Sequence, residues 1–298
     1  MNERPPSPPP PKSLMPIAAL VAVGILAVAG YFGWQHHQAS RQTPPVPPMP
    51  DAPVAAAPTE PAASAPPASP PAIEHPVEEP LAQEGGGSTP LPALADADPY
   101  VRERLIELIG RQNVLGFLQV DGFVRRAVAT VDNLARSHAP VMAWPFNPTP
   151  GRFATRKAEG GSAAETIHPD NGARYQPWVR MVESVDSDRA VALYRRLYPL
   201  LQQAYEDLGF PGRYFNDRLV QVLDHLIATP VPDAPPAVTL VEVKGPVPSA
   251  RPWVRYEFAD PSLEARSAGQ KILLRVGPDN QRRLQAKLVE IRARVARR

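Results

Sequence analysis

The sequence predicts a mainly α-helical protein with a single N-terminal transmembrane helix, a disordered Pro-rich stalk and a helical C-terminal domain with one or two small β-hairpins. Three observations support this prediction. Residues 14–34 form an uncharged apolar run, the 41 prolines are concentrated near the N-terminus, and helical hydrophobic spacing dominates the remainder. We therefore divide the chain into a short tail (1–13), a transmembrane helix (14–34), a stalk (35–95) and a soluble domain (96–298).

The composition excludes several kinds of chemistry. The chain has no cysteine, which removes disulfides, thiolate metal sites, cysteine nucleophiles and acylated lipoprotein anchors. The net charge of +2 is too small to imply a nucleic-acid partner, so we expect none. No metal-binding or nucleotide-binding signature is present, and we expect neither a metal nor a cofactor.

The membrane prediction depends on the segment LMPIAALVAVGILAVAGYFGW at residues 14–34. As a helix it is about 31 Å long, close to the roughly 30 Å hydrocarbon core of a bilayer. Tyr31, Phe32 and Trp34 gather at one end, as expected for rings at the level of the lipid head groups. The alternative is a secretory signal peptide, but the apolar run is longer than a typical one and no small-x-small cleavage site follows it.

The flanking charges predict the orientation. Arg4 and Lys12 precede the helix, whereas only Arg41 follows it closely. The excess of positive charge favours a cytoplasmic N-terminus. We therefore expect a single-pass protein of the inner (cytoplasmic) membrane whose C-terminal domain is periplasmic, in the cell envelope of a Gram-negative bacterium.

The stalk is rich in Pro and Ala, with scattered acids and a GGGS stretch at residues 85–88. It has too few bulky apolar residues to offset the entropy of ordering, which predicts a disordered spacer with polyproline II character. Such a spacer reaches roughly 40 Å as a coil and roughly 170 Å when extended. The alternative is that its proline runs are ligands for proline-reading domains.

In the domain, helical periodicity and capping residues predict a series of helices. Their expected ranges are 98–109, 121–134, 171–185, 187–208 and 213–228, followed by a short helix after Asp260-Pro261 and a last helix after Gly277-Pro278. Asp98 and Asp186 are the predicted N-caps of two of them, and Pro199 is expected to kink or split the long helix near Tyr198.

Two strand pairs are predicted between the helices. RFATR at 152–156 and ETIHP at 165–169 flank a Gly-rich turn, which indicates a short hairpin. VTLVEVK at 238–244 and WVRYEFA at 253–259 are strand-like and are expected to pair with each other.

Several segments together resemble a known family. These are RRAVATVDNL, PGRF, LYRRLYPLLQQAYEDLGFPGRYFNDRLVQVLDHLIATP and YEFADPSLEARSAGQKILLRVGP. In order and spacing they resemble domain of unknown function 3014, found in single-pass proteins of proteobacteria, over nearly all of residues 90–298. The resemblance implies the anchor, stalk and helical domain, but no activity, substrate or catalytic residue.

The densest polar cluster follows the turn Gly209-Phe210-Pro211-Gly212 and is a candidate binding site for a polar ligand. Its candidate ligand-binding residues are Arg213, Tyr214, Asn216 and Arg218, together with Arg195, Arg196 and Tyr198 on the preceding long helix. The alternative is structural: the acids and amide cap helices, the tyrosines pack inward and the arginines cover them.

The candidate catalytic groups are Asp217, Asp224 and His225. Asp217 and Asp224 lie two helical turns apart, and with His225 they would supply an acid and a base if they faced one groove. The alternative is that His225 and His168 are structural histidines and that Asp170 caps a helix, because no catalytic motif accompanies them.

The last helix has a narrow apolar stripe and a basic face. The stripe is too short for an independent coiled coil, which predicts that this helix docks on the domain. Two functions remain open. The first is a binding or interaction module that contacts an envelope protein or a cell-wall component, and the second is an uncharacterised envelope hydrolase that uses Asp217, Asp224 and His225.

Overall fold

The computed structural model describes residues 72–77, 90–157, 165–242 and 251–296, all within the unit Pro67–Arg298. Within these ranges the elements are η1 (Leu94–Asp96), α2 (Asp98–Ile109), α3 (Arg111–Phe117), α4 (Phe123–Leu134), η2 (Val141–Ala143), β1 (Thr155–Lys157), β2 (Glu165–Ile167), α5 (Asp170–Ser184), α6 (Ser187–Asp207), α7 (Phe215–Ile227), β3 (Ala237–Leu240), η3 (Pro252–Val254), β4 (Tyr256–Phe258), α8 (Pro261–Glu264), α9 (Ala268–Arg275) and α10 (Pro278–Val295).

The predicted membrane helix at residues 14–34 lies outside the described residues. Within the described ranges, no helix is both long and apolar enough to cross a membrane. The structure does describe two parts of the predicted stalk, residues 72–77 and 90–95, and there it corrects the prediction of disorder. Residues 72–77 lie against the helical domain, and η1 begins at Leu94, whose side chain is buried. We call residues 72–77 the docked segment.

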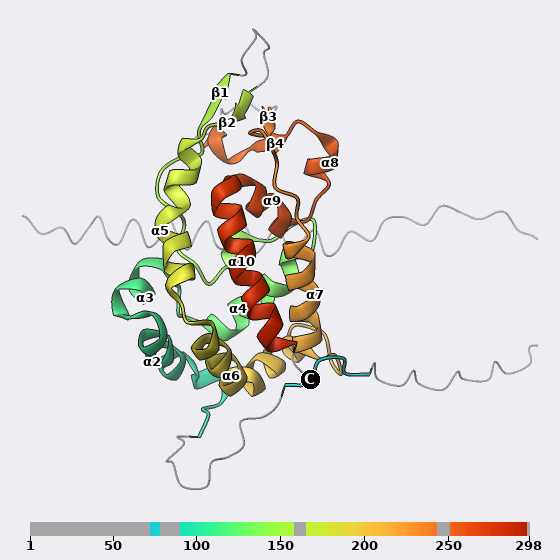
Figure 1. Ribbon diagram of the computed structural model, residues 1–298. Coiled ribbons are helices and arrows are strands. Elements are labelled where there is room, and N and C mark those ends of the chain that lie inside the picture. The colour runs from blue at the N-terminus through green and yellow to red at the C-terminus, as the bar shows by residue number, and fades with distance from the viewer. Residues whose placement is uncertain (1–71, 78–89, 158–164, 243–250, 297–298) are drawn as a thin grey trace, which may run out of the picture. The chain divides into compact units, whose positions relative to one another are not determined.

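The C-terminal helix α10 holds the helical part together. It packs against α5, α6 and α7, and Figure 1 shows it between α5 and α7. Near its start Leu284 packs with Val179 of α5 and Leu226 of α7, and at its end Val295 packs with Val220 of α7. The predicted docking of the last helix is therefore confirmed.

A second core lies on the other side of α6. There α6 presents Leu197, Leu201 and Ala204 to η1, α2, α3 and α4, while Val191, earlier on the same helix, packs against α7 and α10. Phe215, at the start of α7, is 2% exposed and belongs to this second core. Helix α6 thus separates the two cores, and the turn that follows it brings α7 back across its end.

The four short strands form one antiparallel sheet in the order β1-β2-β3-β4. Thr155 pairs with Ile167, Thr166 with Ala237, and Val238 with Phe258. Both predicted hairpins are confirmed, but the sequence did not predict that β2 and β3 join them. The sheet lies at one end of the helices in Figure 1, where three of its side chains pack with Leu274 of α9.

Three local predictions need correction. Another helix, α3, follows directly after Gly110, whereas the next helix was predicted to start at residue 121. Asp98 is the first residue of α2 rather than its N-cap, and its carboxylate instead accepts a hydrogen bond of 2.7 Å from the N–H of Gly122. Helix α6 runs through Pro199 without being split. The predicted cap at Asp186 is confirmed, since its carboxylate accepts the N–H of Arg189 at 2.8 Å.

Candidate functional site

The turn between α6 and α7 positions the candidate site. Gly209 and Gly212 adopt φ values of 108° and 70°, which favour glycine and reverse the chain. Gln202 of α6 then fastens the returning chain: its side-chain amide donates to the carbonyl of Arg213 at 2.8 Å and accepts the N–H of Phe215 at 2.9 Å. The first turn of α7 is therefore held against the middle of α6.

Three tyrosine rings meet where these helices touch. The ring centroids of Tyr194 and Tyr198 are 5.7 Å apart, and those of Tyr198 and Tyr214 are 5.3 Å apart. Burial raises the pKa of Tyr194 and of Tyr198 well above the ordinary value of 10. Their hydroxyls therefore stay protonated, and that of Tyr194 donates to Oδ1 of Asn216 at 2.9 Å.

Asn216 connects these tyrosines to two other parts of the chain. It is fully buried, and its Nδ2 donates to the carbonyl of Val295 at 2.9 Å and to the carbonyl of His75 at 2.8 Å. One amide therefore joins α7 to the end of α10 and to the docked segment. In Figure 1 the docked segment lies beside the C-terminal end of the chain.

The docked segment is held through its main chain. The carboxylate of Asp217 accepts the N–H of Glu74 at 3.1 Å and that of His75 at 2.7 Å. The hydroxyl of Tyr214 accepts the N–H of Val77 at 2.8 Å. We call the set Tyr194, Tyr198, Tyr214, Asn216 and Asp217 the tyrosine site. In this arrangement the site binds the main chain of a segment that bends at Glu74 and His75.

The predicted catalytic residues contact three different partners. Asp217 binds the two N–H groups of the docked segment, Asp224 forms a two-point ion pair with Arg292 at 2.8 and 3.0 Å, and Nε2 of His225 lies 2.9 Å from the hydroxyl of Ser267. Each side chain therefore has a partner on a different element.

The predicted arginines also lie apart from one another. The guanidinium of Arg218 binds the buried carboxylate of Asp132 at 3.0 Å, that of Arg195 donates to the carbonyl of Arg294 at 3.4 Å, and that of Arg196 donates to the hydroxyl of Tyr100. Arg213 contributes its carbonyl to the turn described above. Of the predicted binding residues, the structure thus brings together Tyr198, Tyr214 and Asn216, with Asp217 beside them.

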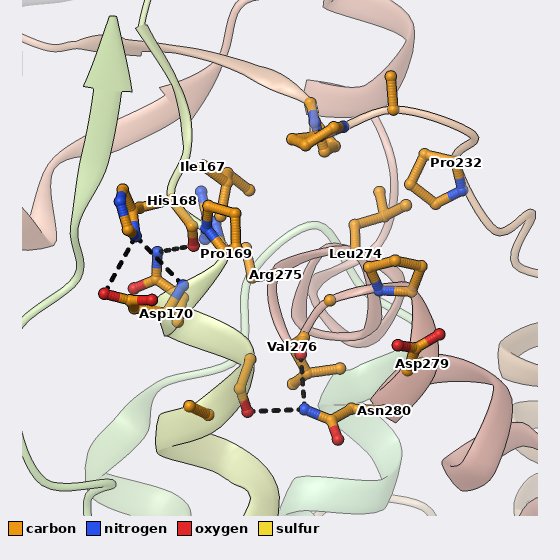
Figure 2. A pocket seen from close by; sticks show the side chains of 18 of the residues that line it. Ile167, His168, Pro169, Asp170, Pro232, Leu274, Arg275, Val276, Asp279 and Asn280 are labelled. Carbon is orange, nitrogen blue, oxygen red and sulfur yellow. Dashed lines mark hydrogen bonds and ion pairs between the residues drawn. The ribbon is translucent and has the colours of Figure 1, made fainter.

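A hollow that the sequence did not predict lies between the N-terminal ends of α5 and α10. It has a volume of about 420 Å³, and five prolines line it: Pro169, Pro232, Pro235, Pro236 and Pro278. Figure 2 shows His168 and Asp170 on one side and Asp279 and Asn280 on the other. The proline run at residues 230–236 was the only sequence signal for this wall.

His168 and Asn280 on these walls already have partners. Nδ1 of His168 accepts the N–H of Asp170 at 3.2 Å. Asp170 is the first residue of α5 rather than its predicted N-cap. Nδ2 of Asn280 donates to the carbonyls of Gly172 and Val276 at 2.8 and 2.9 Å. Among the residues that the structure describes, no group of three or more His, Asp or Glu side chains is arranged to hold a metal ion.

These observations define a mainly helical domain with a small four-stranded antiparallel sheet and a site that binds polypeptide main chain. A family model described as Protein of unknown function (DUF3014) matches residues 123–292, which is more than half of the chain. The chain belongs to this family, and the resemblance seen in the sequence is confirmed. No curated protein and no solved structure matches the chain.

Proposed function

We propose that this protein is a non-enzymatic, membrane-anchored binding module of the cell envelope, held away from the bilayer by its stalk. The observation that carries the proposal is the separation of Asp217, Asp224 and His225. A hydrolase needs its acid, base and nucleophile within reach of one another in a pocket. Here each has its own structural partner, whereas the side chains of the tyrosine site bind the main chain of the docked segment.

The proposed location rests on the sequence. Residues 14–34 anchor the chain in the inner membrane, and the excess of positive charge before them places the N-terminus in the cytoplasm and the domain in the periplasm. A reporter that is active only in the cytoplasm, fused at the C-terminus, tests this orientation. Activity of that reporter would refute the periplasmic location.

The proposed partner is an envelope protein or a cell-wall component. The test uses the full-length protein in detergent micelles, incubated separately with purified cell-wall sacculi and with solubilised envelope proteins. We expect saturable binding to one of them that weakens when Tyr214 is replaced by Phe. Absence of binding to both would refute the proposal.

The same preparation tests the hydrolase alternative. We expect no release of soluble products from envelope polymers above that given by a variant with Asp217→Asn, Asp224→Asn and His225→Gln. Hydrolysis by the unmodified protein that this triple variant lacks would establish the enzyme instead.

A further inference from the structure

We propose that the tyrosine site is a reversible binding site for a short bent segment of polypeptide, and that the docked segment is its built-in ligand, which an external peptide with the same main-chain pattern displaces. This inference rests on the proposed binding function and deepens it, because it names the site and the chemical class of the ligand. The ligand is a segment that bends at two consecutive residues, Glu74 and His75 in the docked segment, and continues with a proline and an apolar residue.

The contacts identify main chain as the feature that is recognised. One carboxylate, Asp217, accepts two consecutive N–H groups at 3.1 and 2.7 Å, and charge-assisted hydrogen bonds of this kind are stronger than neutral ones. Asn216 then donates to the carbonyl of His75 at 2.8 Å, and Tyr214 accepts the N–H of Val77 at 2.8 Å. Hydrogen bonds to main-chain groups depend little on which side chains a peptide carries, so they give affinity largely independent of its sequence.

Two side chains of the docked segment restrict which sequences fit. Pro76 has no N–H that needs an acceptor, and its fixed φ lowers the entropy lost when the segment is held in one conformation. Val77 packs against the apolar core around α6. The side chains of Ile73 and Glu74 are exposed, so these two positions are weakly specified.

The site and the docked segment belong to different parts of the chain. The site residues, from Tyr194 to Asp217, fall within the range 123–292 that matches the family model, whereas the docked segment precedes that range. Main-chain bonds to a few side chains therefore join a segment outside the family match to a surface within it. This is the arrangement of a receptor and a tethered ligand.

The length of the connection between the docked segment and the domain sets how strongly the segment competes with an external peptide. Residues 78–89 connect the docked segment to the domain, and a short connection gives an effective concentration on the order of millimolar. An external peptide with a dissociation constant of about 0.1 mM would then bind the unmodified chain roughly tenfold more weakly than a chain without the segment.

The experiment measures this competition in the full-length chain. In one variant, residues 72–77 are replaced by Gly-Ser-Gly-Ser-Gly-Ser, and a fluorescein-labelled peptide, Ala-Ile-Glu-His-Pro-Val, is titrated while fluorescence anisotropy is recorded. We expect saturable binding to this variant, roughly tenfold weaker binding to the unmodified chain, and at least tenfold weaker binding when the variant also carries Asp217→Asn. Asp224→Asn is the matched control, because it makes the same change on the same helix at a residue that pairs with Arg292, and it should leave peptide binding unchanged.

Hydrogen exchange in the unmodified chain provides a second measurement that does not need the replacement variant. Asp217→Asn should speed the exchange of the Glu74 and His75 amides at least tenfold, and Asp224→Asn should not. Unchanged exchange in Asp217→Asn would overturn the assignment of the site.

The remaining outcomes of the titration are also decisive. A folded replacement variant that binds no peptide would overturn the inference, and so would a replacement variant that fails to fold, since the segment would then be part of the core. Either failure leaves one part of the test of the proposed function unaffected, namely saturable binding of the unmodified protein to sacculi or to envelope proteins, because that measurement uses other ligands. Only the comparison with Tyr214→Phe depends on the tyrosine site.

Discussion

Replacing Gly269 by Ala tests how tightly α9 is seated on its neighbours. A Cβ at this position would lie 2.5 Å from Cδ2 of Leu226 and 2.9 Å from the carbonyl oxygen of Leu134. The leucine side chain is able to move, but the carbonyl belongs to the backbone at the end of α4. Helix α9 itself has little freedom to retreat, because the N–H of Ala268 donates to the carbonyl of Arg136 at 2.7 Å.

The magnitude follows from two opposing effects. Alanine favours a helix over glycine by up to about 1 kcal/mol, whereas overpacking of this kind costs about 1–3 kcal/mol. We expect Gly269→Ala to lower the free energy of unfolding by about 1–2 kcal/mol, which lowers Tm by about 2–8 °C in a domain of this size.

Gly116→Ala is the matched control. Gly116 lies within α3, and a Cβ there meets no atom within 4 Å. The helix preference then acts alone, and the variant should gain about 0.5–1 kcal/mol. Thermal unfolding of the full-length variants in detergent, followed by circular dichroism at 222 nm, measures both. A Gly269→Ala protein as stable as the Gly116→Ala protein would refute the packing argument.

Three further predictions concern charged and buried groups. Arg218→Leu should lower the free energy of unfolding by about 1.5–3 kcal/mol, because it removes a charged hydrogen-bond partner from Asp132, which is 3% exposed. Denaturant titrations measure this, and an unchanged midpoint of unfolding would contradict it. Burial acts to raise the pKa of Glu264, but the stronger combined effect of the Lys271 ammonium and a backbone N–H lowers it below the ordinary 4.5. Its stabilising contribution is therefore present above pH 4.5 and is lost as the pH falls through the lowered value, so Glu264→Gln should destabilise the protein at pH 7 but not near pH 3 in urea titrations. Burial raises the pKa of Tyr194, so the folded protein is favoured below pH 10 and loses stability above it. Absorbance at 295 nm should show Tyr194 ionising only as the protein unfolds. Ionisation of Tyr194 near pH 10 in a folded sample would contradict its burial.

The parts of the fold that the sequence predicted are those with local causes. Asp186 was recognisable as a cap, and its carboxylate accepts an N–H from the first turn of α6. The pair Asp260-Pro261 was recognisable as the start of a helix, and Asp260 accepts an N–H from the first turn of α8. Gly110 and Gly209 mark the ends of helices in the sequence and adopt positive φ in the structure. Such signals depend on a few neighbouring residues, so one sequence is enough to read them.

The parts that were missed depend on distant residues. The pairing of Thr166 with Ala237 joins the two hairpins, and nothing in either hairpin specifies the other as its neighbour. Helix α3 is too short to show periodicity. The docked segment was assigned to the stalk because its surroundings are rich in Pro and Ala, although its main-chain partners lie more than 130 residues away.

The candidate site was predicted only in part, again because some of its contacts depend on distant residues. Tyr198, Tyr214 and Asn216 were chosen for their density near one turn, and that turn does bring them together. Asp224 and His225 were grouped with Asp217 because Asp217 and Asp224 lie two helical turns apart and were expected to face one groove. Consecutive helical residues point in different directions, however, and these two contact Arg292 of α10 and Ser267 before α9.

The pairing of β2 with β3 has a consequence for the order of folding. Each hairpin closes a short loop, but the join between them closes a loop that contains all of α5, α6 and α7. Long loops cost more entropy to close, and this cost must be met before the contact contributes stability. We therefore expect the three helices to collapse first and bring the hairpins together, so that the complete sheet forms late in refolding. Slow amide protection at Val238, delayed relative to the interior of α6, is the kinetic signature to expect.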